Sequence, residues 1–395
     1  MLNAVWNASF GALQQIGLRA SGYHAAPLLF RWNVVESGIH FGSGIVKGLV
    51  TLKRMLLATV VLAELVGSAR QAWAGLILTS AGNSEKLTLA TYASGFPNRG
   101  DGLGPIGVGF PTSGGVLISV EGGSASAVYQ FATGANGQTA AGAVLRSYAG
   151  GNSVGGIASV GSQLYMAEAS LNRVIQLNND GSAGAAAGSF TGNPVGLATD
   201  PSNGHLFVSV YLGGIWDLNP KTGMATALST QNVDGITFDS AHRILYGATA
   251  DATRVIGLNV DTHTNVFDSG LIPGRPDGTA LGFGSLAGNL FVNTNAGTVV
   301  EVNLSTLVQT TIANGGSRGD LVAVDPFDNS LFLTQSGEVM RLSAPAGSGF
   351  GQTPEPASLT MLGLGALSIA VIAWLRKHRA VPRHGGRHQR TVRDE

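Results

Sequence analysis

Residues 194–218 carry the pattern that decides the fold: Pro-Val-Gly-Leu-Ala-Thr-Asp at 194–200, His-Leu-Phe-Val-Ser at 205–209 and Gly-Ile-Trp-Asp-Leu at 214–218. Three short runs of apolar and β-branched residues are separated by turn residues, which is the pattern of antiparallel strands joined by hairpins. Elsewhere a more polar fourth run ending in glycine follows the third, as at 187–192. The unit is therefore predicted to be a four-stranded antiparallel sheet.

The same unit recurs along the chain about every 40 residues. Equivalent points are Pro105, Gly156, Gly196, Gly235, Gly278 and Asp320, which are 51, 40, 39, 43 and 42 residues apart. A period of this length is typical of propeller blades. Six such units predict an all-β, six-bladed β-propeller over residues 75–345. A β-sandwich or a solenoid with the same number of strands is the alternative.

The sixth unit ends at Leu342 after three strands instead of four. Upstream of the first unit, Leu-Ala-Thr-Tyr-Ala-Ser-Gly at 89–95 resembles the fourth run Leu-Arg-Ser-Tyr-Ala-Gly at 145–150. We therefore expect the N-terminal strand to complete the last blade and close the ring, because closure removes open sheet edges. Neither a sandwich nor a solenoid explains the displaced strand.

The units resemble the NHL and related six-bladed propeller families. The resemblance is strongest at 164–177, which reads Leu-Tyr-Met-Ala-Glu-Ala-Ser-Leu-Asn-Arg-Val-Ile-Gln-Leu, and next at 200–208. It extends as a pattern over residues 86–343. Such a resemblance implies the architecture and carries no particular activity with it.

The C-terminal region has three parts in sequence. Pro354, Glu355 and Pro356 are followed by 17 uncharged residues at 359–375 and then by a basic cluster. The uncharged run has the length of a short transmembrane helix, and the basic cluster would hold its end in the cytoplasm. The two prolines disfavour a helix, so the triplet should be extended and accessible to a protease. The basic cluster consists of Arg376, Lys377 and Arg379.

This tail resembles the PEP-CTERM sorting signal of Gram-negative bacteria, the substrate of exosortase. The resemblance covers 354–379, between a predicted linker at 346–353 and a disordered basic tail at 380–395. It implies export, transient anchoring in the inner membrane, cleavage near the Pro-Glu-Pro triplet and release to the cell surface or an extracellular matrix. Exosortase and the secretion machinery would then be partners. An ordinary anchor that is never cut is the alternative, although it needs no such triplet.

The N-terminal region also predicts export. Basic residues 53–54 precede a short apolar run, and Ala72-Trp73-Ala74 forms an A-x-A site. Together they predict a signal peptide at 51–74 that begins as a signal helix and is cleaved after Ala74. Residues 1–50 are interpreted as an upstream leader from a start codon assigned too early, the alternative being a genuine long leader.

The part between the two signals is acidic. Residues 75–353 hold 10 of the 23 Lys and Arg but 18 of the 23 Asp and Glu, a net charge near −8. A nucleic-acid partner would require a basic face, so none is expected. The chain contains no cysteine, which excludes disulfides and thiol chemistry.

Polar residues precede or begin the innermost strand of each unit, where a propeller places one mouth of its central channel. Oxygen ligands gathered there would suit a hard cation such as Ca²⁺, although no cofactor is required. The preferred interpretation is that Asp and Asn are simply good turn residues, since turn chemistry predicts the same residues. These residues are Asp101, Asn152, Asn193, Asp234, Asp277 and Asp320.

Two classes of function fit the sequence. One is an exported surface or matrix protein whose propeller binds exopolysaccharide or surface proteins and has no catalytic residues. The other is a secreted, metal-dependent hydrolase similar to propeller lactonases. Lactonases hold their metal with Glu, Asn and Asp, and no matching Glu maps onto an inner strand. The first class is therefore preferred.

Overall fold

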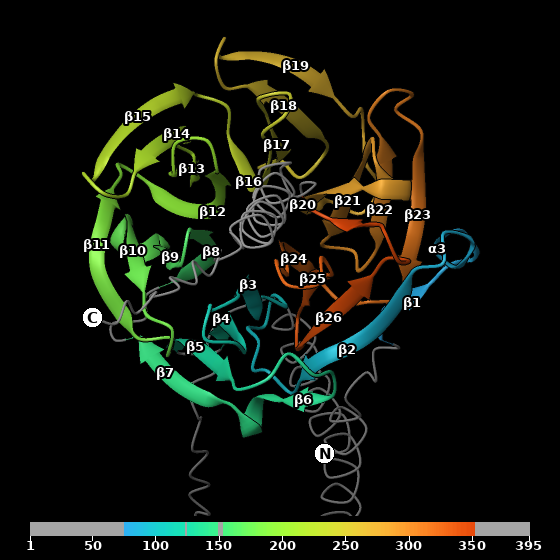
Figure 1. Cartoon of the computed structure of the whole chain (residues 1–395), viewed down its shortest axis with the longest axis horizontal. Helices are drawn as coiled ribbons and strands as arrows, with labels where there is room; N and C mark the ends of the chain where they lie inside the picture. Colours follow the sequence, from blue (N-terminus) through green and yellow to red (C-terminus); the bar gives the residue numbers. More distant parts are fainter. Residues whose placement is uncertain (1–74, 123–124, 149–152, 352–395) are drawn as a thin grey trace, which may run out of the picture. The chain divides into compact units, whose positions relative to one another are not determined.

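The computed structural model describes residues 75–122, 125–148 and 153–351. Within these residues six sheets are arranged around a common centre (Figure 1). Each innermost strand packs against the innermost strand of the next sheet, and the sixth packs against the first. The ring is therefore closed, and the predicted six-bladed β-propeller is confirmed.

Blades 1 to 3 run outward from the centre in chain order. Blade 1 contains β3 (Pro105–Gly109), β4 (Val116–Gly122), β5 (Ala125–Phe131) and β7 (Val144–Tyr148). Blade 2 contains β8 (Val154–Val160), β9 (Gln163–Glu168), β10 (Arg173–Leu177) and β11 (Ala183–Ser189). Blade 3 contains β12 (Asn193–Asp200), β13 (His205–Tyr211), β14 (Gly214–Asn219) and β15 (Met224–Ser229).

Blades 4 to 6 follow the same plan, except that the last strand of blade 6 comes from the start of the chain. Blade 4 contains β16 (Val233–Asp239), β17 (Ile244–Thr249), β18 (Val255–Asn259) and β19 (Thr264–Asp268). Blade 5 contains β20 (Pro276–Phe283), β21 (Asn289–Thr294), β22 (Val299–Asn303) and β23 (Gln309–Asn314). Blade 6 contains β24 (Gly319–Val324), β25 (Leu331–Gln335), β26 (Glu338–Ser343) and β2 (Thr88–Ser94).

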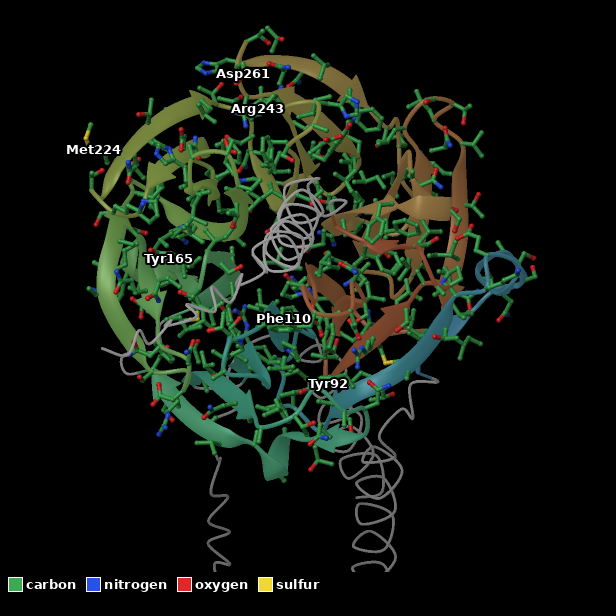
Figure 2. All side chains as sticks on the ribbon, viewed as in Figure 1. Tyr92, Phe110, Tyr165, Met224, Arg243 and Asp261 are labelled. Carbon is green, nitrogen blue, oxygen red and sulfur yellow. The ribbon has the colours of Figure 1, made fainter. Side chains whose placement is uncertain are left out.

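Strand β2 closes the ring, as the displaced fourth strand predicts. It pairs antiparallel with β26 along its whole length, from Thr88 opposite Ser343 to Ser94 opposite Glu338. Tyr92 is fully buried, and its hydroxyl donates to the Thr133 carbonyl at 2.8 Å. Figure 2 shows Tyr92 at this seam between blades 6 and 1. Strand β2 is thus bonded to the last blade and packed against the first.

Short elements cover the edges. The outer edge of blade 5 is extended by β1 (Ile77–Leu78) and the helix α3 (Ser80–Ser84), and β6 (Gln138–Thr139) pairs in parallel with β2. Three 3₁₀ turns lie at Ala140–Gly142, Ala169–Leu171 and Gly284–Leu286.

The predicted linker at 346–353 is not free along its described length. Strand β27 (Gly349–Phe350) pairs with the end of β20, and the fully buried Phe350 makes an edge-on contact with Phe291. The linker expectation is therefore wrong for these residues, because an aromatic side chain in the Gly-rich run gives them a place in blade 5.

The core lies between neighbouring blades. The aromatic residues of the second strands, which include Tyr165, Phe207 and Phe332, are 0–5% exposed and pack into clusters that draw on adjacent sheets. Their recurrence in the sequence therefore reflects packing.

The predicted leader, the signal peptide with Ala72 and Ala74, the transmembrane helix at 359–375 and the basic residues after it lie outside the described residues. None of the helices within the described residues is long and apolar enough to cross a membrane.

Candidate functional site

The central channel is narrowest where backbones meet. Each inner strand carries a bulge here, at a position that is glycine in five blades, and a side chain at any of these glycines would collide with a neighbour. A Cβ on Gly235, for example, would lie 2.4 Å from the Asp277 carbonyl oxygen. The five glycines are Gly107, Gly156, Gly196, Gly235 and Gly278.

Blade 6 has Leu321 at this level instead of glycine. Its two methyl carbons lie 3.1 Å and 2.9 Å from where Cβ atoms on Gly156 and Gly235 would be, so its side chain reaches two other blades. Leu321 is 4% exposed, and a cavity of only about 20 Å³ remains beside it. Leu321 therefore plugs the channel and separates its two mouths.

The mouth at the C-terminal ends of the inner strands is an apolar funnel of about 240 Å³. Val108, Phe110, Ile157 and other apolar residues form its wall, and Figure 2 shows Phe110 near the centre of the ring. Hydroxyl groups from Ser159, Thr199, Thr237 and Thr279 are among its lining. None of its lining residues is acidic or basic, so it suits a small neutral ligand.

The opposite mouth is acidic on one side. The residue immediately before the narrow level is aspartate in three consecutive blades and uncharged in the other three. Asp234, Asp277 and Asp320 are therefore called the acidic mouth. The corresponding residues of blades 1 to 3 are Ile106, Gly155 and Val195.

The acidic mouth has two buried residues and one half-buried residue, Asp234, and is only partly hydrogen-bonded. Asp277 and Asp320 are each 6% exposed. Asn295 donates to Oδ2 of Asp277 at 2.7 Å, whereas Oδ1 of Asp277 and Oδ1 of Asp234 are buried without a hydrogen-bond partner. Arg318 approaches Oδ2 of Asp320 at 3.5 Å. Two carboxylate oxygens in adjacent blades are therefore free to accept hydrogen bonds.

Burial is the main cause of raised pKa values in the acidic mouth. It raises the pKa of Asp277 to about 6, against the lowering effects of Asn295 and Arg318. Burial and then the charge of Asp277 raise the pKa of Asp234 well above its usual range. The pKa of Asp320 is raised by burial and then by Asp277 and Asp234. Carboxyl groups from three neighbouring inner strands therefore lie close enough to influence one another's ionisation.

A chain of ion pairs surrounds the acidic mouth. Arg318 lies 3.8 Å from Asp101, and Arg99 bonds both Asp101 at 2.9 Å and the buried Glu121 at 2.8 Å. Burial also raises the pKa of Glu121. Arg275 also lowers the pKa of Asp277. Among the described residues, five carboxyl groups are thus set against three guanidinium groups. The site therefore has an excess of acidic groups.

The six residues predicted to line one mouth separate into groups. Asp234, Asp277 and Asp320 converge, and Asp101 joins them only through Arg318. Asn193 begins β12 with an exposed side chain, and Asn152 lies outside the described residues.

No group of three His, Cys, Asp or Glu residues in the described part of the chain is arranged to hold a metal ion. Ca²⁺ also accepts backbone and amide carbonyl oxygens, so the predicted cation site stays a prediction. Sequence reasoning missed Arg318 and Asn295. Arg318 was detectable as a cation two residues before Asp320, but nothing in the sequence connects Asn295 with Asp277.

A second acidic feature lies at the edge of blade 5. Glu85 and Glu301 line a cavity of about 390 Å³ together with Lys86, Asn289 and Ser348. Burial, followed by the hydrogen bond and charge of Glu85, raises the pKa of Glu301 to about 8. Glu301 therefore holds its proton to a higher pH than an exposed glutamate does.

Comparison with known proteins gives one sequence match and several structural ones. Residues 352–377 match the PEP-CTERM protein-sorting motif. No curated protein matches the chain in sequence. The chain thus carries a PEP-CTERM sorting motif directly after a six-bladed propeller. Such a motif implies a secreted protein with a membrane-anchored precursor and exosortase as the processing partner.

The structural neighbours are propellers of the NHL and SMP-30 type. A gluconolactonase from Xanthomonas campestris is 14% identical with a TM-score of 0.52, over 69% of this chain and 95% of that one. A luciferin-regenerating enzyme is 12% identical with a TM-score of 0.50, over 67% and 98%. A Bacteroides thetaiotaomicron protein of unknown function is 12% identical with a TM-score of 0.50, over 66% and 76%. At these identities the likeness establishes the fold alone.

Proposed function

We propose that this chain is exported, anchored in the inner membrane as a precursor and processed by exosortase, and that its propeller then acts as a binding module at the cell surface or in an extracellular matrix. The position of the sorting motif carries the proposal. It begins at residue 352, directly after the last described residue, Gly351. Ring closure uses β2 and β26, not the tail. Removal of the tail would therefore leave a complete propeller.

The two mouths favour binding over catalysis. The lining of the apolar funnel has no side chain that exchanges protons near neutral pH. Among the described residues, no three His, Cys, Asp or Glu side chains are grouped as ligands for one metal ion. A closed ring with one neutral and one acidic recess suits recognition of a surface protein or a polysaccharide.

Export and processing can be tested in cells that make the protein. One strain carries the natural chain, and another has Pro354, Glu355 and Pro356 replaced by alanine. Mass spectrometry of the natural protein should find an N-terminus after Ala74 and a C-terminus near the triplet, in released material. The variant should stay in the membrane with its tail. Recovery of both proteins with intact tails in the same fraction would refute processing.

A secreted metal-dependent hydrolase is the second candidate. The convergence of Asp234, Asp277 and Asp320 at a channel mouth favours it, and the gluconolactonase from Xanthomonas campestris has the same fold. Metal analysis of the processed protein, melting curves with and without Ca²⁺ and an assay with simple lactones separate the candidates. The binding module predicts no stoichiometric metal, an unchanged melting temperature and no turnover. Stoichiometric Ca²⁺ with turnover would replace it by the hydrolase.

A further inference from the structure

We propose that the acidic mouth is the binding site for a guanidinium or ammonium group on a basic, apolar-flanked segment of a partner polypeptide. This inference names the partner of the proposed binding module and rests on that function. It starts from two buried carboxylate oxygens that lack hydrogen bonds, Oδ1 of Asp234 and Oδ1 of Asp277. Buried polar atoms are almost always hydrogen-bonded, so two unbonded acceptors on neighbouring inner strands indicate a missing donor.

The free oxygen of Asp277 is held in place. Asp234 and Asp277 lie on β16 and β20, whose strands pack side by side, and the Asp277 carbonyl lies 2.4 Å from a Cβ built on Gly235. Asn295 donates to the other oxygen of Asp277 and to the Gly319 carbonyl, both at 2.7 Å. The carboxylate of Asp277 is therefore oriented before any ligand arrives, which lowers the entropy lost on binding.

The internal cation does not serve these oxygens. Arg318 lies 3.5 Å from Asp320 and 3.8 Å from Asp101, toward the other side of the acidic mouth. Arg275 and Arg318 lower the pKa of Asp277, but neither donates a hydrogen bond to its free oxygen. Asp234 and Asp277 thus lack a hydrogen-bonded counter-ion.

The geometry favours an organic cation over a metal ion. Ca²⁺ needs six to eight oxygen ligands at about 2.3–2.6 Å around one point. No three acidic or histidine side chains of the described residues are arranged in this way. A guanidinium or ammonium group instead makes separate directed hydrogen bonds of about 2.7–2.9 Å to acceptors that stand apart. Arg318 already places a guanidinium among these carboxylates.

Exposed leucines on the same face indicate the flanking chemistry. Leu212 is 79% exposed, and its amide donates at 2.8 Å to Asn232, which lies two residues before Asp234. Leu271 is 69% exposed in the connection that leads into β20 and Asp277. Leu212 also has a φ of 57°, in the left-handed region that is strained for a leucine. An apolar side chain held outward in a strained turn suits contact with a partner.

The test uses the processed protein and the peptide acetyl-Leu-Arg-Leu-amide as probe. Isothermal titration at pH 6 in two buffers with different ionisation enthalpies measures affinity and proton uptake or release together. We expect saturable one-to-one binding with release of protons, because the cation displaces protons from the acidic mouth. The same peptide with citrulline, which is neutral, in place of arginine should bind about 10- to 100-fold more weakly.

Matched variants locate the site. Asp277→Asn should weaken binding about 10- to 100-fold and reduce proton release, whereas Asp268→Asn, an exposed aspartate on β19, should bind normally. Leu212→Ser should also weaken binding. Leu307→Ser should not, although Leu307 is 45% exposed with a φ of 61°, because it lies in the β22–β23 turn on the opposite face. Circular dichroism and melting curves confirm that each variant is folded.

Several results would overturn the inference. The first is that the arginine peptide shows no saturable binding. The others are that the citrulline peptide binds as tightly as the arginine peptide, or that Asp277→Asn binds the arginine peptide normally. Stoichiometric Ca²⁺ would assign the mouth to a metal instead. Tight binding of glucosamine oligomers that is unchanged in the Leu212→Ser variant would assign the acidic mouth to a cationic polysaccharide. Failure of export or processing in cells would not change the result of the peptide titration. The proposed function and this inference can therefore be refuted independently.

Discussion

Leu321 decides whether the propeller has a channel. Five blades bring glycine to the narrowest level, and the sixth brings a leucine whose methyl groups reach blades 2 and 4. One side chain thus separates an acidic mouth from an apolar funnel. Ligands bound at the two mouths cannot meet while it is present.

A double-mutant cycle tests this plug. A Cβ on Gly156 would lie 3.1 Å from Leu321 Cδ1, and Gly156 is not among the residues with positive φ. Gly156→Ala should therefore destabilise the natural protein, and Leu321→Ala should relieve part of that loss. We expect a coupling free energy of about 0.5–3 kcal/mol from urea unfolding. Gly134→Ala, where a Cβ meets nothing within 4 Å, should show no coupling.

The raised pKa values predict how stability changes with pH. Asp277 has a folded pKa of about 6 against 3.8, and Glu301 has one of about 8 against 4.5. The folded state therefore holds these protons more tightly than the unfolded state. Their contribution to stability is complete below about pH 4 and is lost as the pH rises, through 6 for Asp277 and through 8 for Glu301.

Asp277→Asn removes the first of these losses. The variant should match the natural protein near pH 4 and have the higher free energy of unfolding at pH 7. Urea unfolding at five pH values between 4 and 8 measures the free energy of unfolding of both proteins. Subtracting one from the other cancels the contribution of acids that both share, such as Asp200, whose pKa is lowered. Glu301→Gln should likewise raise the free energy of unfolding relative to the natural protein, and this increase should keep growing up to about pH 8. A difference that does not change with pH would refute the raised pKa values.

At the scale of elements, β2 holds the ring closed. Tyr92 donates to the Thr133 carbonyl and contacts Phe131 and Phe332 edge-on, so its side chain joins three parts of the chain that are far apart in sequence. Strand β1 is also an N-terminal strand, but it only extends the outer edge of blade 5, with Ile77 59% exposed.

Substitutions in the two strands should therefore differ in effect. Tyr92→Ala should lower the free energy of unfolding by about 3–5 kcal/mol, and Tyr92→Phe by about 1 kcal/mol, through loss of the hydrogen bond alone. Ile77→Ala should change it by less than about 0.5 kcal/mol. Urea unfolding measures all three. Light scattering should also detect association of Tyr92→Ala, because a loosened β2 exposes the edge of β26. Equal losses at the two sites would contradict closure by β2.

At the scale of the whole molecule, we expect the propeller and its tail to be separable, with a boundary after Phe350. A protein of residues 75–358 and one of residues 75–351 should melt within about 1 °C of each other. A protein ending at Ser348 should melt roughly 5–10 °C lower, because it loses the fully buried Phe350. Differential scanning calorimetry measures the three. If the protein ending at Ser348 melted at the same temperature as the two longer ones, residues 346–351 would be a linker, as the sequence predicts.

Much of the architecture was predictable, because each blade repeats one local pattern. The period gave six blades, and the missing fourth strand gave the closure by residues 89–95. The boundary at Phe350 was not predictable, since pairing between β27 and β20 joins residues nearly 70 positions apart. The candidate site was predictable in part: Asp234, Asp277 and Asp320 converge, whereas Asn193 points to solvent.

The sequence by itself determined the six blades, the closing strand and the sorting motif, because strand periodicity, turn residues and a short linear motif are local properties. Only the tertiary structure decided that Leu321 closes the channel and that three of six candidate residues share one buried mouth. It also showed that Asn295 and Arg318 belong to that mouth. These facts depend on which side chains from different blades reach the axis together, and that is set by bulges and packing across the ring.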